Sequence, residues 1–406
     1  MKKGLLVLLA ATLVLAPSCG KWGLSPDEPE LITEPETEPS DLSKADPGLA
    51  LAANSFGLDL FKRICAQRPE DNTAFSPLSL SLMLAMAAEG AEGDTYTQFS
   101  KVLGWGDKTK EELGEFYQTM INGLVAADPE VSFTSANSFW MAAGFPFETD
   151  YQSLLTRFFH ADTFTEDFSL PATVKKLNDW CSEKTAGKIP VLCDQLPPEC
   201  VMILVNALLF KAPWTFKWEV QKGRGFRTAG GTVVKKDYLC TETEFSYSEW
   251  ENYEVVGIPY GNGSFRLEVL LPREGKTLAQ VVAGLDDVRK TYAGGQGKGK
   301  LYLPMFSIED ESNDLIGQLA DLGLTLPFTS GANFSGISKE PLYISKIVQK
   351  VKLDVTEKGT EFAAVTGGFG AVSLPKSVSV DLNRPFLFQI RELTTGSVLL
   401  LGTLSK

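Results

Sequence analysis

The chain has 406 residues, of which 44% are apolar and 22% are charged, the balance of an ordinary folded globular protein. This composition excludes a disordered chain, a collagen and a coiled coil. Lys and Arg number 38 against 51 Asp and Glu, so the net charge is −13 and phosphate backbones are repelled. We therefore expect no nucleic-acid partner.

The first residues have the pattern of an export signal. Met1-Lys2-Lys3 is positively charged, and an uninterrupted apolar run, too short to span a membrane, continues from Gly4 to Ala16. Ala16-Pro17-Ser18-Cys19 then resembles a bacterial lipoprotein cleavage site, although leucine is usual where Ala16 stands. The sequence predicts a signal peptide over residues 1–18 and a lipid on Cys19 that anchors an exported protein to the outer membrane or cell surface. Ordinary secretion is the alternative.

A change of composition follows the signal. Residues 20–48 hold five prolines, eight acidic residues and two lysines, a net charge of −6. Such a segment cannot bury a core, and proline keeps it extended. We interpret residues 19–48 as an acidic, Pro-rich tether. No Pro/Gly-rich break divides residues 49–406, so these are expected to form one large domain.

Histidine and cysteine usage limits the chemistry. His160 is the single histidine, so a Ser-His-Asp or Cys-His enzyme would depend on it alone, and a multi-His metal site is excluded. It ends an apolar helical run, where a helix C-terminus favours a cation, and we expect a structural role. Five cysteines remain after Cys19, and the Cys193–Cys200 spacing fits neither CxxC chemistry nor a zinc knuckle. We expect mostly small buried apolar thiols, no metal and no cofactor.

Hydrophobic periodicity places helices before strands. Apolar residues at helical spacing predict helices over residues 49–64, 78–89, 110–126 and 150–159. Apolar or alternating runs predict strands over residues 131–141, 201–210, 255–260, 265–271, 300–308, 347–355, 386–391 and 398–404. This order indicates an α+β fold with large mixed or antiparallel sheets.

Four separated motifs resemble those of the serpin family. They are Phe75-Ser76-Pro77-Leu78-Ser79-Leu80, Asn206-Ala207-Leu208-Leu209-Phe210-Lys211-Ala212-Pro213-Trp214, Glu357-Lys358-Gly359-Thr360-Glu361-Phe362-Ala363-Ala364-Val365-Thr366 and Asn383-Arg384-Pro385-Phe386-Leu387-Phe388. Because they cover 49–406 in the right order, the chain is identified as a member of this family. The resemblance implies about eight or nine helices packed on three β-sheets, and an exposed reactive-centre loop at about residues 357–380. It also implies a monomeric protease inhibitor, not an enzyme.

The resemblance assigns roles to two groups of residues. A sheet-opening region would comprise Ser76, Ser79, Asn206, Trp214 and Gln349. The hinge of the loop would comprise Glu357, Gly359, Thr360, Glu361, Phe362, Ala363, Ala364 and Thr366. From Gly359 to Leu374 the only charge is Glu361, so the stretch is a poor surface loop but a tolerable central strand. In the family, the cut loop inserts into the main sheet and carries the trapped acyl-enzyme away.

Phe362 departs from the family pattern. Thr360, Phe362, Ala364 and Thr366 share one face of an inserted strand, the face that the family turns inward. Alanine is usual at 362, and overpacking by a phenyl ring commonly costs about 1–3 kcal/mol. Slow insertion would turn an inhibitor into a substrate. The alternative function is therefore a non-inhibitory serpin that acts as a surface binding or structural lipoprotein.

The cut bond follows from family spacing. Counting forward from Gly359 places the acyl-side residue at Ser373, whereas counting back from Pro385 gives Leu374. The candidates are Ser373–Leu374 and Leu374–Pro375, and the proline argues for the first. A small residue here suits elastase-like or subtilisin-like serine proteases, with papain-like cysteine proteases as an alternative.

Two other predictions concern regulation. The family has a histidine where Gln349 stands, and this amide could bond to Asn206 and Ser79 but cannot titrate. Residues 94–106 carry only Lys101 as a base, so we expect no polyanion activator.

Overall fold

The structure is a computed structural model that describes residues 4–15, 40–312, 315–357 and 375–406. For residues 4–15 the description is of the backbone. The predicted lipid site Cys19, most of the tether, the hinge from Gly359 to Thr366 and the candidate bonds at Ser373 and Leu374 lie outside the described residues.

The predicted helices are confirmed, and the described residues form eight α-helices. These are α1 Pro47–Gln67, α2 Pro77–Glu89, α3 Gly93–Leu103, α4 Lys110–Ala126, α5 Thr149–Phe159, α6 Pro171–Lys184, α7 Leu278–Ala283 and α8 Ile316–Asp321. Three short 3-10 helices are η1 Leu42–Lys44, η2 Val288–Thr291 and η3 Leu326–Phe328. Within the described part of the chain, no helix is both long and apolar enough to cross a membrane.

The strands form a six-stranded and a ten-stranded network. Sheet A has the order β11 Phe306–Ser312, β12 Leu342–Val355, β1 Gly4–Leu15, β5 Cys200–Lys211, β3 Ser132–Ala142, β4 Asp162–Glu166. The second network contains β13 Lys376–Ser377, β10 Gly295–Pro304, β7 Val233–Glu249, β8 Tyr253–Tyr260, β9 Phe265–Pro272, β15 Phe386–Glu392, β16 Val398–Leu404 and β2 Thr73–Phe75, with β6 Glu219–Arg227 on β7 and β14 Val380–Asp381 on β10.

The two smaller of the three expected sheets are continuous through one long strand. The 17-residue β7 pairs with β6 and β10 along most of its length, and its last residues, from Ser246, pair with β8. The predicted strand 300–308 is wrong as a single element. It divides after Pro304, so that β10 joins the second network and β11 joins sheet A. Proline limits ladder pairing, which favours a change of sheet at that point.

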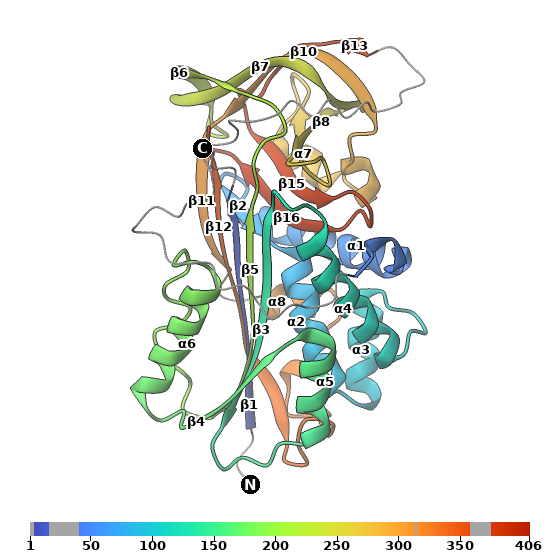
Figure 1. Ribbon diagram of the computed structural model, residues 1–406, viewed down its shortest axis with the longest axis vertical. Helices are drawn as coiled ribbons and strands as arrows, with labels where there is room; N and C mark the ends of the chain where they lie inside the picture. Colours follow the sequence, from blue (N-terminus) through green and yellow to red (C-terminus); the bar gives the residue numbers. More distant parts are fainter. Residues whose placement is uncertain (1–3, 16–39, 313–314, 358–374) are drawn as a thin grey trace.

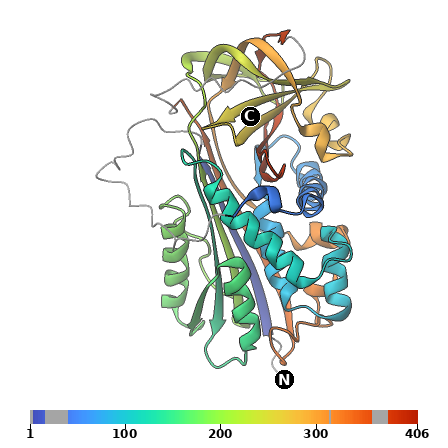
Figure 2. The same ribbon diagram turned by 45° about the vertical axis from the view of Figure 1, so that its right-hand side comes forward.

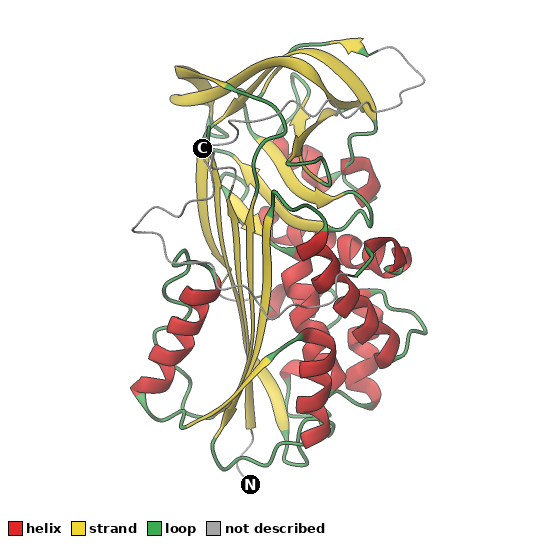
Figure 3. Cartoon of the chain, in the orientation of Figure 1, coloured by secondary structure: helices red, strands yellow, loops and turns green. Residues whose placement is uncertain are grey.

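Sheet A is covered on both faces. Helix α6 lies alone on one face, and α1 to α5 lie on the other (Figure 1, Figure 3), an arrangement that persists after rotation (Figure 2). Strand β5 shows why its run is continuously apolar. Ile203 and Val205 pack in the cluster beneath α6, while Leu204 and Leu208 pack in the main core.

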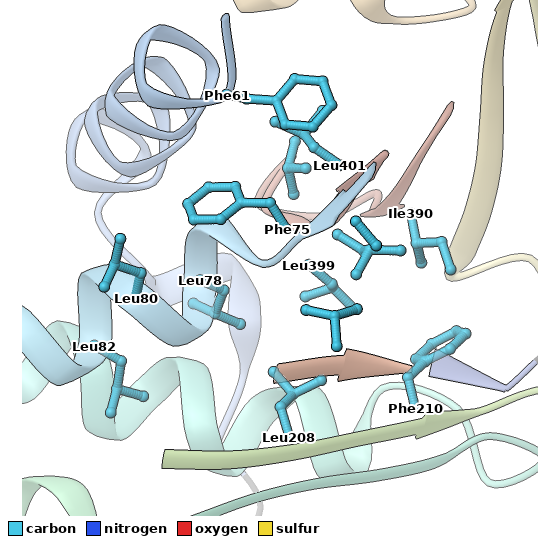
Figure 4. Close-up of a cluster of buried hydrophobic side chains, with 14 of the residues drawn as sticks. Phe61, Phe75, Leu78, Leu80, Leu82, Leu208, Phe210, Ile390, Leu399 and Leu401 are labelled. Atoms are coloured by element: carbon cyan, nitrogen blue, oxygen red, sulfur yellow. The ribbon is translucent and has the colours of Figure 1, made fainter. Parts of the chain in front are cut away.

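Helix α2 is the centre of the main core. All of its residues are buried, as an apolar surface all around the helix requires. Pro77 stands at the first helical position, and the Ser76 side chain accepts a hydrogen bond from the Ser79 N–H. Figure 4 shows α2 against β5 and the C-terminal strands, with the labelled side chains Phe61, Phe75, Leu78, Leu80, Leu82, Leu208, Phe210, Ile390, Leu399 and Leu401.

The folded domain begins earlier than residue 49. Leu42 and Ala45 are buried in the main core, and the Leu42 side chain fills the space beside Gly123 of α4. Asp46 caps α1 by accepting from the N–H groups of Gly48 and Leu49. Residues 41–48, which we assigned to the tether by their charge and prolines, therefore belong to the domain because their few apolar side chains find a site on it.

Glu89, at the end of α2, predicts a pH-dependent stability. It is 5% exposed, its Oε2 atom has no hydrogen-bond partner among the described residues, and burial raises its pKa from 4.5 to about 7. Lys110 opposes this shift and Glu111 adds to it. The folded chain thus keeps a proton that the unfolded chain has lost, and this contribution to stability, full below pH 4.5, is lost as pH rises toward 7.

We expect Glu89→Gln to raise the free energy of unfolding at pH 8 by about 2–3 kcal/mol and to change it little at pH 4.5. Urea unfolding at the two pH values measures the difference. The exposed Glu115→Gln on α4 is the matched control. An equal effect of Glu89→Gln at both pH values would contradict the explanation by titration.

Candidate functional site: the central position of sheet A

The apolar part of the expected signal peptide occupies the central position of sheet A. Strand β1 lies between β12 and β5 and runs parallel to both of them (Figure 1). Its pairing extends from Gly4 to Leu15 along β12. Removal of residues 1–18 stays a prediction.

The directions of β12 and β5 determine how another segment of the chain could pair between them. Because β12 and β5 are both parallel to β1, they are parallel to each other. A segment that follows Val355, the end of β12, could pair beside β12 only as an antiparallel strand. Neighbouring strands lie about 4.8 Å apart, and one strand, β1, separates β12 from β5 here.

Two polar pairs fix the edges of this position to the start of α2. Gln349 on β12 accepts from the Ser76 N–H at 2.9 Å and donates to the Ser76 carbonyl at 3.0 Å. On the opposite edge, the Ser79 hydroxyl donates to the Asn206 side-chain carbonyl. Ala10 of β1 is the register partner of both Gln349 and Asn206, so the two pairs lie at the same level.

Gln349 therefore differs in its partners from our expectation. It bonds to the backbone of Ser76, whereas Ser79 and Asn206 bond to each other. The reason is geometric: one strand separates β12 from β5, and each edge bonds to the serine beneath it. Four of the five predicted sheet-opening residues, Ser76, Ser79, Asn206 and Gln349, are brought together here and are buried.

The polar group extends to residues that we did not predict for the site. The Asn206 amide donates to Asn137 Oδ1 at 2.8 Å and to Ser135 Oγ at 3.1 Å on β3. The Ser76 hydroxyl donates to the Leu399 carbonyl on β16 at 2.7 Å. Ser135 and Asn137 are two positions apart on β3, so they share one face of the strand, and this pair of polar residues on one face is the signal that could have indicated them.

Trp214, the fifth predicted residue, lies at the end of sheet A where the loop begins. Its indole N–H donates to the Thr356 carbonyl at 3.2 Å, one residue before Glu357. The ring is fully buried and stacks on Tyr260 with centroids 4.5 Å apart. Trp214 therefore fixes the backbone at Thr356, and its own ring is held in place by stacking on Tyr260. Glu357 itself is exposed.

The C-terminal side of the loop is also anchored. Lys376 and Ser377 form β13, which pairs with Gly297 and Lys298 of β10. The Lys376 ammonium contacts the Glu249 carboxylate, an anchor that sequence reasoning missed because the two residues are 127 positions apart. Thus the segment between 357 and 375 is held at both ends by described residues.

His160 has the structural role that we expected, but its electrostatics differ. It caps α5 with a left-handed φ of 49°, its Nε2 atom is buried with no hydrogen-bond partner among the described residues, and burial lowers its pKa. Burial thus acts against the cation that the helix C-terminus favours.

The five cysteines among the described residues show no sign of disulfide bonding or of nucleophilic activation. Cys65, Cys181, Cys193, Cys200 and Cys240 are all free thiols. Burial raises the pKa of Cys181 and of Cys200 to about 12. A raised thiol pKa is typical of inert apolar cysteines rather than of nucleophiles. Within the described ranges, no group of three or more His, Cys, Asp or Glu side chains could hold a metal ion.

Comparison with known proteins agrees with this architecture. The family model described as serpin (serine protease inhibitor) matches residues 51–406. The chain is 31% identical to the plasma serine protease inhibitor of Bos taurus, over 93% of this chain and 96% of the relative. It is 32% identical to the leukocyte elastase inhibitor of Xenopus tropicalis, over 88% and 99%. The crystal structure of the thermophilic serpin tengpin in the native state superposes with a TM-score of 0.77 at 29% identity, covering 91% of this chain and 97% of that one.

The fold and the sequence matches together define a serpin-type protein, with a large mixed sheet A and two smaller sheets. The chain belongs to the serpin family. Serpins are protease inhibitors rather than catalysts, and relatives named as inhibitors support protease inhibition in general for this chain.

Proposed function

We propose that this protein is a suicide-substrate inhibitor of an elastase-like or subtilisin-like serine protease. The protease attacks the bond between Ser373 and Leu374, forms an acyl-enzyme, and is displaced as the loop inserts between β12 and β5. The alternative bond is Leu374–Pro375. A papain-like cysteine protease is the second class of target.

One observation supports this proposal most directly: sheet A accommodates a full-length strand between β12 and β5. The position is next to the segment that leaves β12, and apart from Gln349 and Asn206 the buried side chains along its core side, such as Leu204, Leu208 and Leu353, are apolar. Insertion of the loop would convert two parallel neighbours into antiparallel pairs, which are slightly more stable per residue. About 15 inserted residues would span roughly 50 Å, enough to carry a bound protease from one end of the sheet to the other.

The alternative function is a non-inhibitory serpin that acts as a binding or structural lipoprotein. Phe362 favours it, because a phenyl ring would have to fit where the family has alanine. The inner side of sheet A is already closely filled around the insertion position, with Leu204, Leu208 and Leu353 fully buried. Overpacking such a site commonly costs about 1–3 kcal/mol.

We further propose that the protein is exported and held at the outer membrane or cell surface by a lipid on Cys19. The residues between Cys19 and the start of the domain would act as a spacer. Labelling of growing cells with a palmitate analogue, with Cys19→Ser as the control, would test this. A label that persists in Cys19→Ser would contradict it.

The function is tested with the chain that lacks the predicted signal peptide and the lipid-bearing Cys19. Residues 20–406 would be incubated with neutrophil-type elastase, subtilisin, chymotrypsin and papain, followed by denaturing gels and intact-mass analysis. We expect a band at the summed mass of inhibitor and protease, and a released C-terminal peptide that begins at Leu374. The full-length chain with β1 in place should give cleavage but little adduct, because the insertion position is occupied. Cleavage of residues 20–406 without any adduct would favour the non-inhibitory alternative.

Replacing Phe362 should improve inhibition. Phe362→Ala removes the overpacked ring, so insertion should accelerate relative to hydrolysis of the acyl-enzyme, and fewer inhibitor molecules should be consumed per protease trapped. We expect the excess of that stoichiometry over one to fall by a factor of about 5–150, the rate equivalent of about 1–3 kcal/mol. Titration of residual protease activity measures it. Val365→Ala, on the opposite face, is the control, and an equal change in both variants would contradict the overpacking argument.

A further inference from the structure

A cavity lies away from sheet A, at the junction of four segments. It has a volume of about 790 Å³ and lies between the residues that follow α1, the end of β6, the β9–α7 connection and the residues before β15. A volume of this size is typical of small-molecule sites. None of the residues with an expected role in inhibition, from Ser76 to Leu374, lines it.

The charge of this cavity is opposite to that of the chain. The charged side chains that line it are Arg227, Arg273, Lys276 and Arg384 against Glu70 and Glu274. Four cations against two acids give a local charge of +2, in a protein whose net charge is −13. Such a concave positive site on an acidic surface focuses the electrostatic field on anions.

Three of the four cations have no carboxylate partner among the described residues. Arg273 pairs with Glu249 at 3.5 Å. Within the part of the chain that the structure describes, no Asp or Glu oxygen lies within 4.0 Å of the charged nitrogens of Arg227, Lys276 or Arg384. A cation held in a cavity without an acid partner is a group that a bound anion would satisfy.

Arg384 makes the site rigid. Its Nε and Nη2 atoms donate to the Pro272 carbonyl at 3.0 and 2.7 Å, so the guanidinium is fixed against the β9–α7 connection. Its remaining contact, to Asn383, is long at 3.5 Å. The side chain is half-buried, and desolvation lowers its pKa, although the charges of Glu254, Asp381 and Glu274 oppose this shift and only Arg227 adds to it. Two of its five N–H donors are left for a ligand.

The apolar residues that line the cavity indicate what a ligand would carry besides its anionic group. Val233, which is 64% exposed, lines the cavity together with Pro272 and Leu278. A ligand that satisfied both the cations and these walls would carry an anionic group on a small apolar body. We propose that this cavity binds an organic anion, a phosphate, sulfate or carboxylate attached to an aryl or alkyl group, with Arg227, Lys276 and Arg384 holding the anionic end.

The site is tested with phenyl phosphate as the probe, by isothermal titration into residues 20–406 and into the full-length chain. We expect saturable binding to both, and at least about tenfold weaker binding to Arg227→Gln/Lys276→Gln, because two charge-assisted contacts are lost. Both side chains are exposed or rim positions, so the variant should keep its melting temperature. Lys101→Gln/Lys188→Gln removes the same charge elsewhere and should bind as the unmodified chain does.

Two further measurements show whether the anionic group of the probe and the positive charge of the cavity are responsible for binding. Inorganic phosphate should displace phenyl phosphate, whereas phenol should not. Arg227→Lys, which keeps the charge, should restore most of the affinity lost in Arg227→Gln. The proposal is overturned if phenyl phosphate does not saturate, if phenol displaces it, or if the cavity variant and the Lys101/Lys188 control bind it equally. None of these outcomes depends on protease inhibition.

Discussion

Thr360→Arg is expected to abolish inhibition while cleavage of the loop continues. In the serpin family the inserted loop turns the face that carries Thr360 inward, so this residue would enter sheet A on the inner face, early in insertion. The walls that it would meet there are the buried side chains of Phe210, Leu353 and Val355. Burying a guanidinium among them without a partner costs several kcal/mol, and each 1.4 kcal/mol slows insertion about tenfold. Hydrolysis of the acyl-enzyme would then be completed before the protease is displaced.

The matched control is Glu361→Arg, which places the same side chain one residue later on the opposite face. We expect the adduct on denaturing gels to fall below about a tenth of its unmodified yield for Thr360→Arg, since the barrier rises by several kcal/mol. For Glu361→Arg most of the yield should persist. Equal loss in both variants would show that the alternation is assigned wrongly, or that arginine disturbs recognition of the loop by the protease.

Arg391→Ala is expected to produce the largest loss of stability. Its guanidinium donates to both oxygens of Glu268, at 2.9 and 2.7 Å, and Glu268 is fully buried. Arg266 lies 3.6 Å from the same carboxylate, and the Gln389 amide donates to it at 2.8 Å. Removing Arg391 leaves a buried carboxylate with a single, more distant cation. Such a loss commonly costs about 3–5 kcal/mol.

Urea unfolding of Arg391→Ala measures this loss, and the melting temperature should fall by roughly 4–7 °C in a domain of this size. The double variant Glu268→Gln/Arg391→Met removes both charges, so it should recover a large part of the stability. If the double variant were as unstable as the sum of the two single variants, the two residues would not act as a pair.

Much of this protein could be predicted from its sequence. The helix over residues 110–126 and the strands over 201–210 and 398–404 were located within a residue or two, because apolar periodicity is strong there. The serpin motifs then identified the family, since the residues of each motif meet specific packing requirements. Ser76, Ser79 and Asn206 were assigned to one region and lie together.

Other features depended on contacts between distant segments. Helix α6 was not predicted, because only one face of it is apolar and this face becomes clear only against sheet A. Gln349 was given the wrong partners, since sequence cannot show how many strands separate β12 from β5. The same limit explains the Lys376–Glu249 anchor and the cationic cavity, whose members come from four segments of the chain.

The sequence by itself determined the family, the α+β class, the hinge pattern and the apolar leader, because these depend on residue type and local spacing. Only the tertiary structure decided that the leader pairs between β12 and β5, that residues 41–48 belong to the domain, and that His160 is disfavoured as a cation. These features depend on the space and the hydrogen-bond partners that remain after the rest of the chain has packed. Neither can be derived from the local spacing of residue types.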